Sequence, residues 1–495
     1  MAKEGVTKCE VLSFILSGIL IIGGIALLVS RFPQKFAGWQ IQDKLIISPN
    51  SSIVNAWENP EVPCYMKFYV YNVTNKEEFM NGEKPILEEH GPYTYRMVSP
   101  RFDIKFYVND TVSFRSNHTL YFEPGMSNGS EDDVLFHINL PIVKVSESVQ
   151  SSSISPLLRQ FKVPDKLVKL VGKEDLIVAH TVKEIIFGYD EPMMKLASNI
   201  LAWFGKDLDP TFGPFHEFNN TDDGLFLVGT GRKNFSTFNV IDRWNGKKLL
   251  SYWTTKYANM INGTDGSFLR PNVKRNQTRY TYLPQMQRAA KLEYEQDTTV
   301  KSVRTYRYHF ANDLLSNITE QPDNAGFCVP EGNCFDSGVL NVGRGDAPIF
   351  LSLPHFYLGS ENLQNGVVGL SPNKTLHDSF FHTEPLTGAV MRSQERLQIN
   401  AHVTKSDYFE QLRKVQPVFF PYFWISAEEL VNDDIALNLL HVMKVVDFAC
   451  YLGYIIIFIG LVILGATLAK LYVRRRSTLS RDEEPLISDD HAENA

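Results

Sequence analysis

The sequence predicts an α+β membrane protein with two terminal transmembrane helices and one large lumenal domain built on antiparallel β structure. Three observations predict this class. An apolar segment long enough to cross a bilayer lies near each end of the chain. The polar region between these segments carries every N-glycosylation sequon, which is typical of a loop in the secretory lumen. Alternating β-branched and aromatic runs, separated by turn residues, recur through that region.

The first apolar segment, residues 11–30, contains no charged residue. As an α-helix rising 1.5 Å per residue it extends about 30 Å, which is the thickness of one hydrocarbon core. We therefore predict transmembrane helix 1 at 11–30, after a cytosolic N-terminus at 1–10. A cleaved signal peptide is the alternative, disfavoured because the run is too long and no small-x-small cleavage site follows. Cys9, at the cytosolic edge, is a candidate for palmitoylation.

The second apolar segment lies near the other end of the chain and carries one charge, Asp447, at its edge. Lys470 and the cluster Arg474–Arg476 follow it directly, so the positive-inside rule places the end of the chain in the cytosol. Two spans then place both termini in the cytosol and the intervening loop in the lumen. The predicted regions are a lumenal ectodomain at 31–444, transmembrane helix 2 at 445–469, and a cytosolic tail at 470–495.

The sequons support this topology because all of them fall in the predicted ectodomain. A single Asn-x-Ser/Thr match arises often by chance, but eleven matches confined to one compartment argue for lumenal exposure. The predicted glycosylation sites are Asn50, Asn72, Asn109, Asn117, Asn128, Asn219, Asn234, Asn262, Asn276, Asn317 and Asn373.

Composition and motifs exclude several classes of function. The net charge is −7, and the one tight basic cluster lies at a membrane edge, so no nucleic-acid partner is expected. No nucleophile elbow, zinc-protease motif, phosphate loop or dinucleotide fingerprint is present, and we predict no enzyme, cofactor or metal. A trimeric ligand-gated channel is an alternative, but such channels use many disulfides. Small residues in the spans favour helix packing over a pore: Ser13, Ser17, Gly453, Gly460 and Gly465.

The cysteines predict one local disulfide. Cys328 and Cys334 lie in the segment Asn324-Ala-Gly-Phe-Cys-Val-Pro-Glu-Gly-Asn-Cys334. In an oxidising lumen we expect them to pair and close a short loop. A zinc site is the alternative, disfavoured because no second Cys or His pair is nearby. Cys64 has no evident partner and is expected to be a buried free thiol.

Strand patterns cover most of the predicted ectodomain. Period-two runs rich in β-branched and aromatic residues are bounded by turn signals, including four Asn-Gly pairs at Asn81, Asn245, Asn262 and Asn365. We predict a large antiparallel β architecture. The strands are expected at 65–73, 93–97, 104–108, 111–115, 225–228, 237–243, 302–310, 349–353 and 397–403.

The region 153–205 departs from this pattern and is predicted to be helical. Thr181-Val-Lys-Glu184 has the spacing of a capping box, and Gly205 is a stop signal. One interpretation is a helical cap whose apolar faces pack on the β core; the other is an exposed binding surface. The candidate ligand-binding residues on these helices are Leu167, Leu170, Val171, Met193, Met194, Ile200, Trp203 and Phe204.

Several segments, in order along nearly the whole chain, resemble the class B scavenger receptor family. The segment 324–334 and Asn259-Met-Ile-Asn-Gly-Thr-Asp-Gly266 are the specific ones. Two terminal spans around a glycosylated loop agree with them. The segment around Cys328, Thr181–Tyr189 and the tail most resemble the lysosomal branch. Further resembling segments are Glu89-His-Gly-Pro-Tyr-Thr-Tyr-Arg96, Trp244-Asn-Gly-Lys247, Pro354-His-Phe-Tyr357 and Pro385-Leu-Thr-Gly388.

The resemblance implies an antiparallel β-barrel-like core, an apical helical bundle and a lipid-carrying tunnel through the ectodomain. It also implies a receptor at the lysosomal or late endosomal membrane, with the plasma membrane as a second location. One implied role is sorting a lysosomal hydrolase of the glucocerebrosidase type, bound near neutral pH and released in acid. The other is transport of cholesterol or phospholipid. The alternative is a cell-surface class B scavenger receptor for lipoproteins, lipids, or apoptotic or microbial ligands. The sequence leaves open whether the protein forms a homo-oligomer.

His180 directly precedes the segment Thr181–Tyr189, as a His does in the hydrolase-binding relative. An imidazole changes its charge between pH 5 and 8, so His180 is the candidate pH sensor, with a purely structural histidine as the alternative. Arg344-Gly345-Asp346 is an integrin-type tripeptide that also arises by chance.

The tail carries a predicted sorting signal. Arg481-Asp-Glu-Glu-Pro-Leu-Ile487 fits the acidic dileucine pattern, in which Leu486 and Ile487 fill an apolar adaptor pocket while Asp482 meets a basic patch. Such a motif must lie on an extended, exposed chain. Clathrin adaptor complexes are the expected cytosolic partners.

Overall fold

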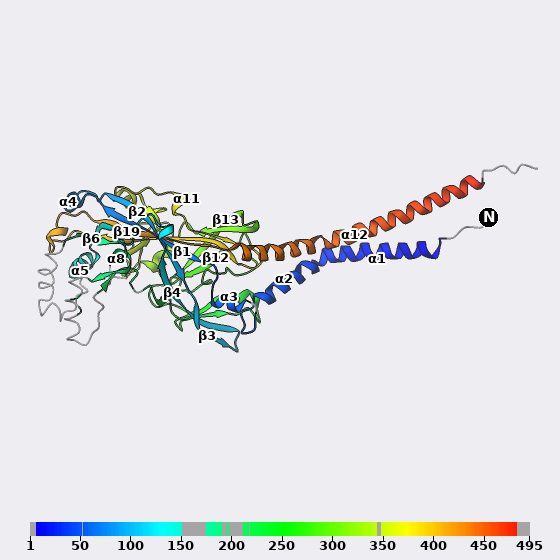
Figure 1. The fold of residues 1–495 in the computed structure, drawn as a ribbon, viewed down its shortest axis with the longest axis horizontal. Coiled ribbons are helices and arrows are strands. Elements are labelled where there is room, and N and C mark those ends of the chain that lie inside the picture. Colours follow the sequence, from blue (N-terminus) through cyan, green and yellow to red (C-terminus); the bar gives the residue numbers. More distant parts are fainter. Residues whose placement is uncertain are drawn as a thin grey trace, which may run out of the picture. The chain divides into compact units, whose positions relative to one another are not determined.

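The computed structural model describes residues 6–51, 53–150, 175–190, 211–216, 218–343 and 348–482, together with Lys195 and Ser198. The chain divides into two compact units. The first comprises 1–43 and 437–495 and is helical in its described part. The second comprises 44–436 and is dominated by β structure (Figure 1).

A 15-stranded antiparallel sheet forms the second unit within the described residues. Its longest path runs β11-β10-β4-β2-β1-β19-β18-β17-β14-β13-β12, while β3, β9, β15 and β16 attach at its sides. The predicted β architecture is therefore confirmed. The strands are β1 Cys64–Val73, β2 Leu87–Val98, β3 Arg101–Tyr107, β4 Thr111–Phe122, β9 Thr221–Asp222, β10 Phe226–Gly229, β11 Ile241–Trp244, β12 Arg279–Leu283, β13 Arg288–Val300, β14 Val303–Phe310, β15 Leu340–Asn341, β16 Ile349–Ser352, β17 Phe380–Thr383, β18 Val390–Val403 and β19 Val418–Leu430.

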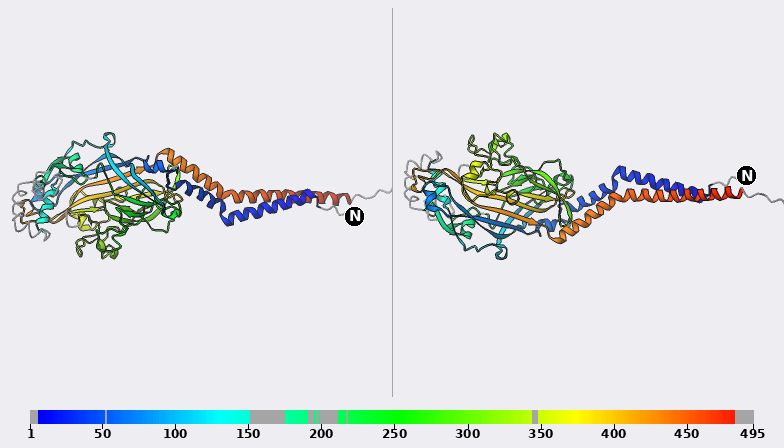
Figure 2. Two further views of the ribbon diagram at one scale, coloured as in Figure 1. Left: turned by 90° about the horizontal axis from the view of Figure 1, so that it is seen from below. Right: turned by 90° about the horizontal axis from the view of Figure 1, so that it is seen from above.

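The expected barrel is not closed by a strand pair, because the path ends at β11 and β12. A short irregular segment lies between these two edges. Ile241 of β11 donates its N–H to the Gly263 carbonyl at 3.0 Å, and Tyr282 of β12 donates to the Thr264 carbonyl at 3.0 Å. The curvature of the sheet is visible in both views of Figure 2. The core is thus a strongly curved open sheet whose edges are linked through 263–264.

The core lies on one face of the central strands. On β1, Met66, Phe68 and Val70 point to this face, as the two-residue period of a strand requires, and each is at most 6% exposed. The Phe68 ring meets the rings of Tyr95 and Phe423 edge-on, at centroid distances of 5.4 and 5.7 Å. Aromatic side chains from β1, β2 and β19 therefore fix the packing of the sheet interior.

Shorter elements surround the sheet. Two small ladders complete the described strands: β5 Val134–Ile138 with β6 Ile177–Thr181, and β7 Tyr189–Asp190 with β8 Thr211–Phe212. The helices of this unit are α3 Val54–Glu58, α4 Lys76–Met80, α5 Leu140–Gln150, α8 Val182–Phe187, α10 Glu361–Asn365 and α11 Lys374–His377, with short 3-10 turns η1 Pro124–Met126, η2 Phe235–Thr237, η3 Pro322–Phe327, η4 Pro354–Phe356 and η5 Glu410–Leu412.

Three local predictions were wrong. The helical prediction for 153–205 fails at 177–181, where β6 pairs with β5, because this pairing buries Ile177 in the core. The strand predicted at 237–243 begins only at Ile241, after the turn η2. The Asn365-Gly366 pair does not form a hairpin turn: it ends helix α10, and Gly366 has a negative φ of −66°.

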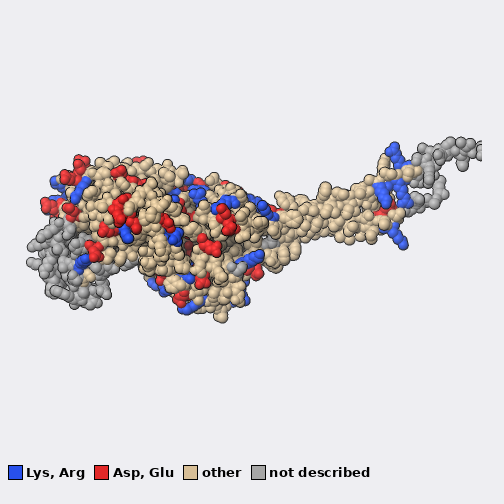
Figure 3. Space-filling model, in the orientation of Figure 1, with Lys and Arg blue, Asp and Glu red and all other residues tan. Residues whose placement is uncertain are grey.

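The first unit contains α1 Lys8–Ser30 and most of two further helices, α2 Phe32–Leu45 and α12 Asp433–Asp482. Two of these helices, Lys8–Ser30 and Asp433–Ser477, are long and apolar enough to cross a membrane. Figure 3 shows a helical surface almost free of charge that ends in a cluster of Lys and Arg side chains. The apolar segments predicted from the sequence thus lie inside longer helices.

Small residues bring α1 and α12 into close contact. A Cβ atom added to Gly24 would lie 2.6 Å from Ile457 and 2.8 Å from the Gly453 carbonyl oxygen. One added to Gly460 would lie 3.1 Å from the Ser17 carbonyl oxygen. This confirms packing at Ser17, Gly453 and Gly460. At Gly465 nothing lies within 4 Å of the Cβ position, so its predicted packing role is wrong within the described residues.

The tail differs from the prediction. Helix α12 continues to Asp482, so the chain is helical, not extended, up to the first residue of the predicted sorting signal. The helix continues because the polar segment 470–482 contains neither Gly nor Pro. Leu486 and Ile487 lie outside the described residues.

Candidate ligand-binding site around His180

The candidate site is built on the β5–β6 ladder and helix α8. These elements lie with α5 at one end of the second unit, opposite the end where the chain enters it from α2 and leaves it into α12 (Figure 1). In the ladder, Leu135 pairs with His180 and His137 pairs with Val178. The two histidines therefore lie diagonally on neighbouring strands, within reach of each other.

His137 and His180 share a hydrogen bond whose direction follows from geometry. The His137 Nδ1 lies 3.0 Å from the carbonyl oxygen of Ile138, which can only accept, so Nδ1 carries the proton. The His137 Nε2 must then accept, and the His180 Nδ1 donates to it across 2.9 Å. Since a neutral or a charged His180 can make this donation, His180 can gain a proton on Nε2 without losing the bond.

The two rings differ in their readiness to become charged. His137 is 1% exposed, and burial, reinforced by the neighbouring His180, lowers its pKa from 6.5 to about 3. His180 is half-buried and stacks on the Tyr189 ring with centroids 3.8 Å apart. Burial lowers the pKa of His180 as well, while the Glu184 carboxylate opposes the shift. His180 is therefore neutral at neutral pH and is the member of the pair that acid protonates.

A capping box holds the segment that follows. The Thr181 Oγ1 accepts from the Glu184 backbone N–H at 3.2 Å, and the Glu184 carboxylate accepts from the Thr181 backbone N–H at 2.9 Å. The predicted box is confirmed, and it starts helix α8 directly after His180. The box therefore positions the Glu184 charge beside the histidine pair.

An apolar patch lies on the solvent side of the same ladder. Val134 and Phe136 of β5 are 60% and 46% exposed, while the alternate residues Leu135 and His137 are buried. Ala179 of β6 is paired with Phe136 and is also exposed. Such an exposed aromatic side chain on a rigid strand is typical of a protein contact surface. We refer to Val134, Phe136 and Ala179 as the β5–β6 patch.

The candidate binding residues on the predicted apical helices lie outside the described residues: Leu167, Leu170, Val171, Met193, Met194, Ile200, Trp203 and Phe204. The tripeptide at 344–346 lies outside them too. His137, Tyr189 and the β5–β6 patch were missed by sequence reasoning, because only strand pairing brings residues 134–137 beside His180.

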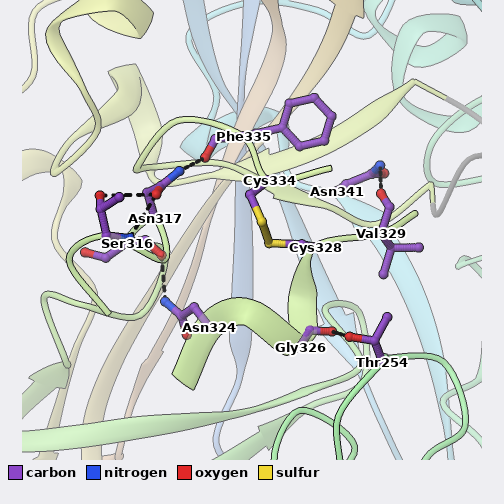
Figure 4. Close-up of a disulfide and its surroundings, with 11 residues drawn as sticks. Thr254, Ser316, Asn317, Asn324, Gly326, Cys328, Val329, Cys334, Phe335 and Asn341 are labelled. Atoms are coloured by element: carbon purple, nitrogen blue, oxygen red, sulfur yellow. Dashed lines mark hydrogen bonds between the residues drawn. A yellow bond between two sulfur atoms is a disulfide. The ribbon is translucent and has the colours of Figure 1, made fainter. Parts of the chain in front are cut away.

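The predicted disulfide is confirmed between Cys328 and Cys334 (Figure 4). Hydrogen bonds hold the surrounding loop: the Asn324 side chain donates to the Ser316 carbonyl at 2.7 Å, and the Asn341 side chain donates to the Val329 carbonyl at 3.0 Å. Cys64 is a free buried thiol, as expected, and burial raises its pKa. Cys9 is exposed at the start of α1.

None of the eleven sequon asparagines is buried. Asn50, Asn109, Asn128, Asn234, Asn276 and Asn373 are exposed, and the others are partly exposed. Glycosylation itself stays a prediction.

Two segments that carried the family resemblance meet inside the second unit. The His355 Nε2 lies 2.7 Å from the Glu89 carboxylate, which also accepts from the Trp424 indole at 2.7 Å. Burial would raise the pKa of Glu89, but the hydrogen bonds from His355 and Trp424 outweigh it and lower that pKa. His355 had no predicted role. This partly buried network joins β2, η4 and β19.

The comparisons with known proteins agree with this architecture. A sequence model described as the CD36 family matches residues 15–471. Lysosome membrane protein 2 of Rattus norvegicus is 36% identical over 449 residues, covering 90% of this chain and 91% of the relative. The Mus musculus protein of that name is 35% identical over 480 residues, covering 95% of this chain and 97% of the relative.

Scavenger receptor class B member 1 of Mus musculus is 34% identical over 392 residues, covering 78% of this chain and 74% of the relative. The match to the family model covers the whole curved sheet and reaches into both long apolar helices. The chain therefore belongs to the CD36 family, the class B scavenger receptors.

Proposed function

We propose that this protein is a lysosomal membrane receptor that carries a lumenal hydrolase of the glucocerebrosidase type and releases it in acid. The names of the lysosomal relatives support the location. The observation that carries the proposal is His180, which makes its hydrogen bond to His137 through Nδ1 and can therefore gain a proton on Nε2 in acid. The opposite face of the same ladder carries the exposed β5–β6 patch. Both termini would be cytosolic, the two long apolar helices would span the membrane, and residues 31–444 would be lumenal.

The direction of the pKa shift of His180 determines how acid changes the stability of the site. Because the folded-state pKa of His180 lies below its unfolded value of 6.5, protonation below about pH 6.5 destabilises the folded site. The stabilisation is complete above that pH and is lost as the pH falls. The new charge would lie next to Tyr189, on the ladder that carries the β5–β6 patch on its other face, and would disturb the packing that supports this patch. Acid would therefore weaken binding and neutral pH would permit it.

The test is retention of lumenal proteins by the full-length chain in detergent at about pH 7.4 and about pH 5. A hydrolase retained at neutral pH and released in acid is expected. His180→Ala should abolish the difference between the two conditions, whereas the control His90→Ala should leave it unchanged. Phe136→Ser should weaken retention at neutral pH. Phe102→Ser removes an aromatic side chain of similar exposure, 43% against 46%, and is its matched control.

The carrier proposal fails if no hydrolase is retained by the wild-type chain. The pH role of His180 fails if retention by His180→Ala still changes with acid.

Lipid transport is the second candidate function, and the inner face of the sheet favours it. Glu395, Ala427 and Glu429 share the core-facing side of β18 and β19 with Met66, yet each keeps part of its surface accessible. Enclosure by protein raises the pKa of Glu395 to about 7, and the neighbouring Glu429 carboxylate adds to this rise. An enclosed but incompletely packed interior supports a passage for sterol or phospholipid. Solvent extraction of the purified chain should then yield bound lipid; a lipid-free extract would exclude a stable complex.

The remaining alternative is a cell-surface scavenger receptor for lipoproteins, lipids, or apoptotic or microbial ligands. The similarity to scavenger receptor class B member 1 supports it. Surface labelling of cells that express the chain separates this alternative from a lysosomal receptor.

A further inference from the structure

A buried arginine lies beside the disulfide. Arg288, the first residue of β13, is 5% exposed. Its Nη2 donates to the Asn324 side-chain oxygen at 2.8 Å, and its guanidinium carbon lies 3.8 Å from the centre of the Phe327 ring. Its Nε is buried without a hydrogen-bond partner. In the part of the chain that the structure describes, no acidic oxygen lies within ion-pair distance of Arg288.

The charge of Arg288 persists despite this burial. Burial lowers its pKa to about 10, so the guanidinium remains protonated at neutral and acid pH. Burying a charge without a paired counter-charge destabilises the folded state, and a single aromatic ring offsets only part of that cost. The Asp313 carboxylate attracts this positive charge from beyond ion-pair distance, so the charge next to the Cys328–Cys334 loop is only partly compensated.

A cavity of about 40 Å³ lies beside this guanidinium. Arg288, Asn324 and Phe327 line it together with the disulfide. Figure 4 shows this loop, in which the side-chain nitrogens of Asn317 and Asn324 are already engaged by backbone carbonyls. A cavity needs roughly 10–15 Å³ to hold a water molecule, so this one has room for a small ion.

We propose that this cavity binds a small monovalent anion, of which chloride is the representative, against the Arg288 guanidinium. One guanidinium balances one negative charge. The lining also includes Asp336, whose carboxylate repels any anion and repels a multivalent anion such as phosphate more strongly than chloride. The anion would supply the missing counter-charge and an acceptor for the unpartnered Nε. The site would thereby couple the stability of the disulfide loop to anion concentration, independently of any hydrolase or lipid.

The test is thermal unfolding of the full-length protein in detergent, with chloride replacing gluconate at constant ionic strength. Wild-type protein should show a rise in Tm that saturates with chloride, bromide should reproduce it, and phosphate should not. Arg288→Met should lose the rise. Arg279→Met is the matched control, because Arg279 is also buried with an unpartnered Nε but does not line this cavity; it should keep the rise.

A second measurement does not depend on the folding of Arg288→Met. Chloride NMR line broadening by the wild-type chain should disappear on titration with bromide, and Arg288→Lys should weaken it. A Tm independent of chloride in the wild-type protein would overturn the proposal. So would an equal chloride response in the wild-type protein and a folded Arg288→Met variant.

Discussion

At the scale of single residues, burial decides which ionisable side chains keep their usual pKa. Glu395 lies on the inner face of β18, across from Ala427, and its pKa is raised to about 7 by burial. His180 lies in a less enclosed place and its pKa is lowered. The two shifts have opposite consequences, since acid neutralises Glu395 and charges His180. The interior of the sheet should therefore gain stability in the same pH range in which the His180 site loses it.

Replacing Glu395 by Gln tests this enclosure. Because the folded-state pKa is raised above the ordinary value of 4.5, ionisation at neutral pH opposes folding, and this cost vanishes as the pH falls toward 4.5. Glu395→Gln should raise stability by about 1–2 kcal/mol near pH 7.5 and change it little near pH 5. Denaturant unfolding at both pH values measures the difference. An equal effect at both values would show that Glu395 is not enclosed.

The disulfide and the aromatic core contribute different amounts to the free energy of unfolding. Removing the Cys328–Cys334 bond frees a short loop, so Cys328→Ser with Cys334→Ser should cost about 2 kcal/mol. Truncating the fully buried Phe68 to Ala should cost more, about 3–5 kcal/mol, because it opens a cavity among four aromatic rings. Unfolding free energies of the variants test the order. A larger loss from the cysteine variant would contradict a purely local role for the bond.

At the scale of elements, the long helices pair through small side chains. Gly24 faces Gly453 and Ser17 faces Gly460, and both pairs are seven residues apart along their helices. Membrane helices associate through such close backbone approach, because lipid removes the hydrophobic driving force. Gly23 points away from this contact, since nothing lies within 4 Å of its Cβ position. The face of the helix on which each glycine lies thus decides whether a larger side chain is tolerated there.

A pair of leucine substitutions tests this contact. Gly24→Leu would force the helices apart and should cost about 1–3 kcal/mol of stability. Gly23→Leu adds the same side chain to the open face and should have little effect. Thermal unfolding of the full-length chain in detergent compares them. Similar losses in both variants would mean that the helices do not pair in this register.

At the scale of the whole molecule, the proposed role needs a lumenal receptor unit, a membrane anchor and a cytosolic sorting signal. The curved sheet places the His180 site at the end of the second unit opposite its chain entry and exit (Figure 1). The predicted sorting signal begins where α12 ends, at Asp482. A dileucine pair beyond a helix end can present both apolar side chains to an adaptor pocket.

Substitution of the dileucine pair tests the predicted sorting signal. Leu486→Ala with Ile487→Ala should move the steady-state population from lysosomes to the cell surface, because the adaptor loses its apolar contact. Ser488→Ala, a neighbouring polar position, is the control and should leave the distribution unchanged. Microscopy and surface biotinylation measure the shift. An unchanged lysosomal fraction in the double variant would remove the sorting role from this motif.

The sequence by itself determined the features that depend on neighbouring residues. Apolar length located both long helices, strand period located most of the sheet, and short-range spacing identified the Thr181–Glu184 capping box and the cysteine pair. Only the tertiary structure decided which distant segments meet. It joined His137 to His180, Glu89 to His355 and Arg288 to the disulfide loop, and left the sheet open between β11 and β12. The physical reason is that hydropathy and capping act within a few residues, whereas strand pairing and burial act across the whole chain.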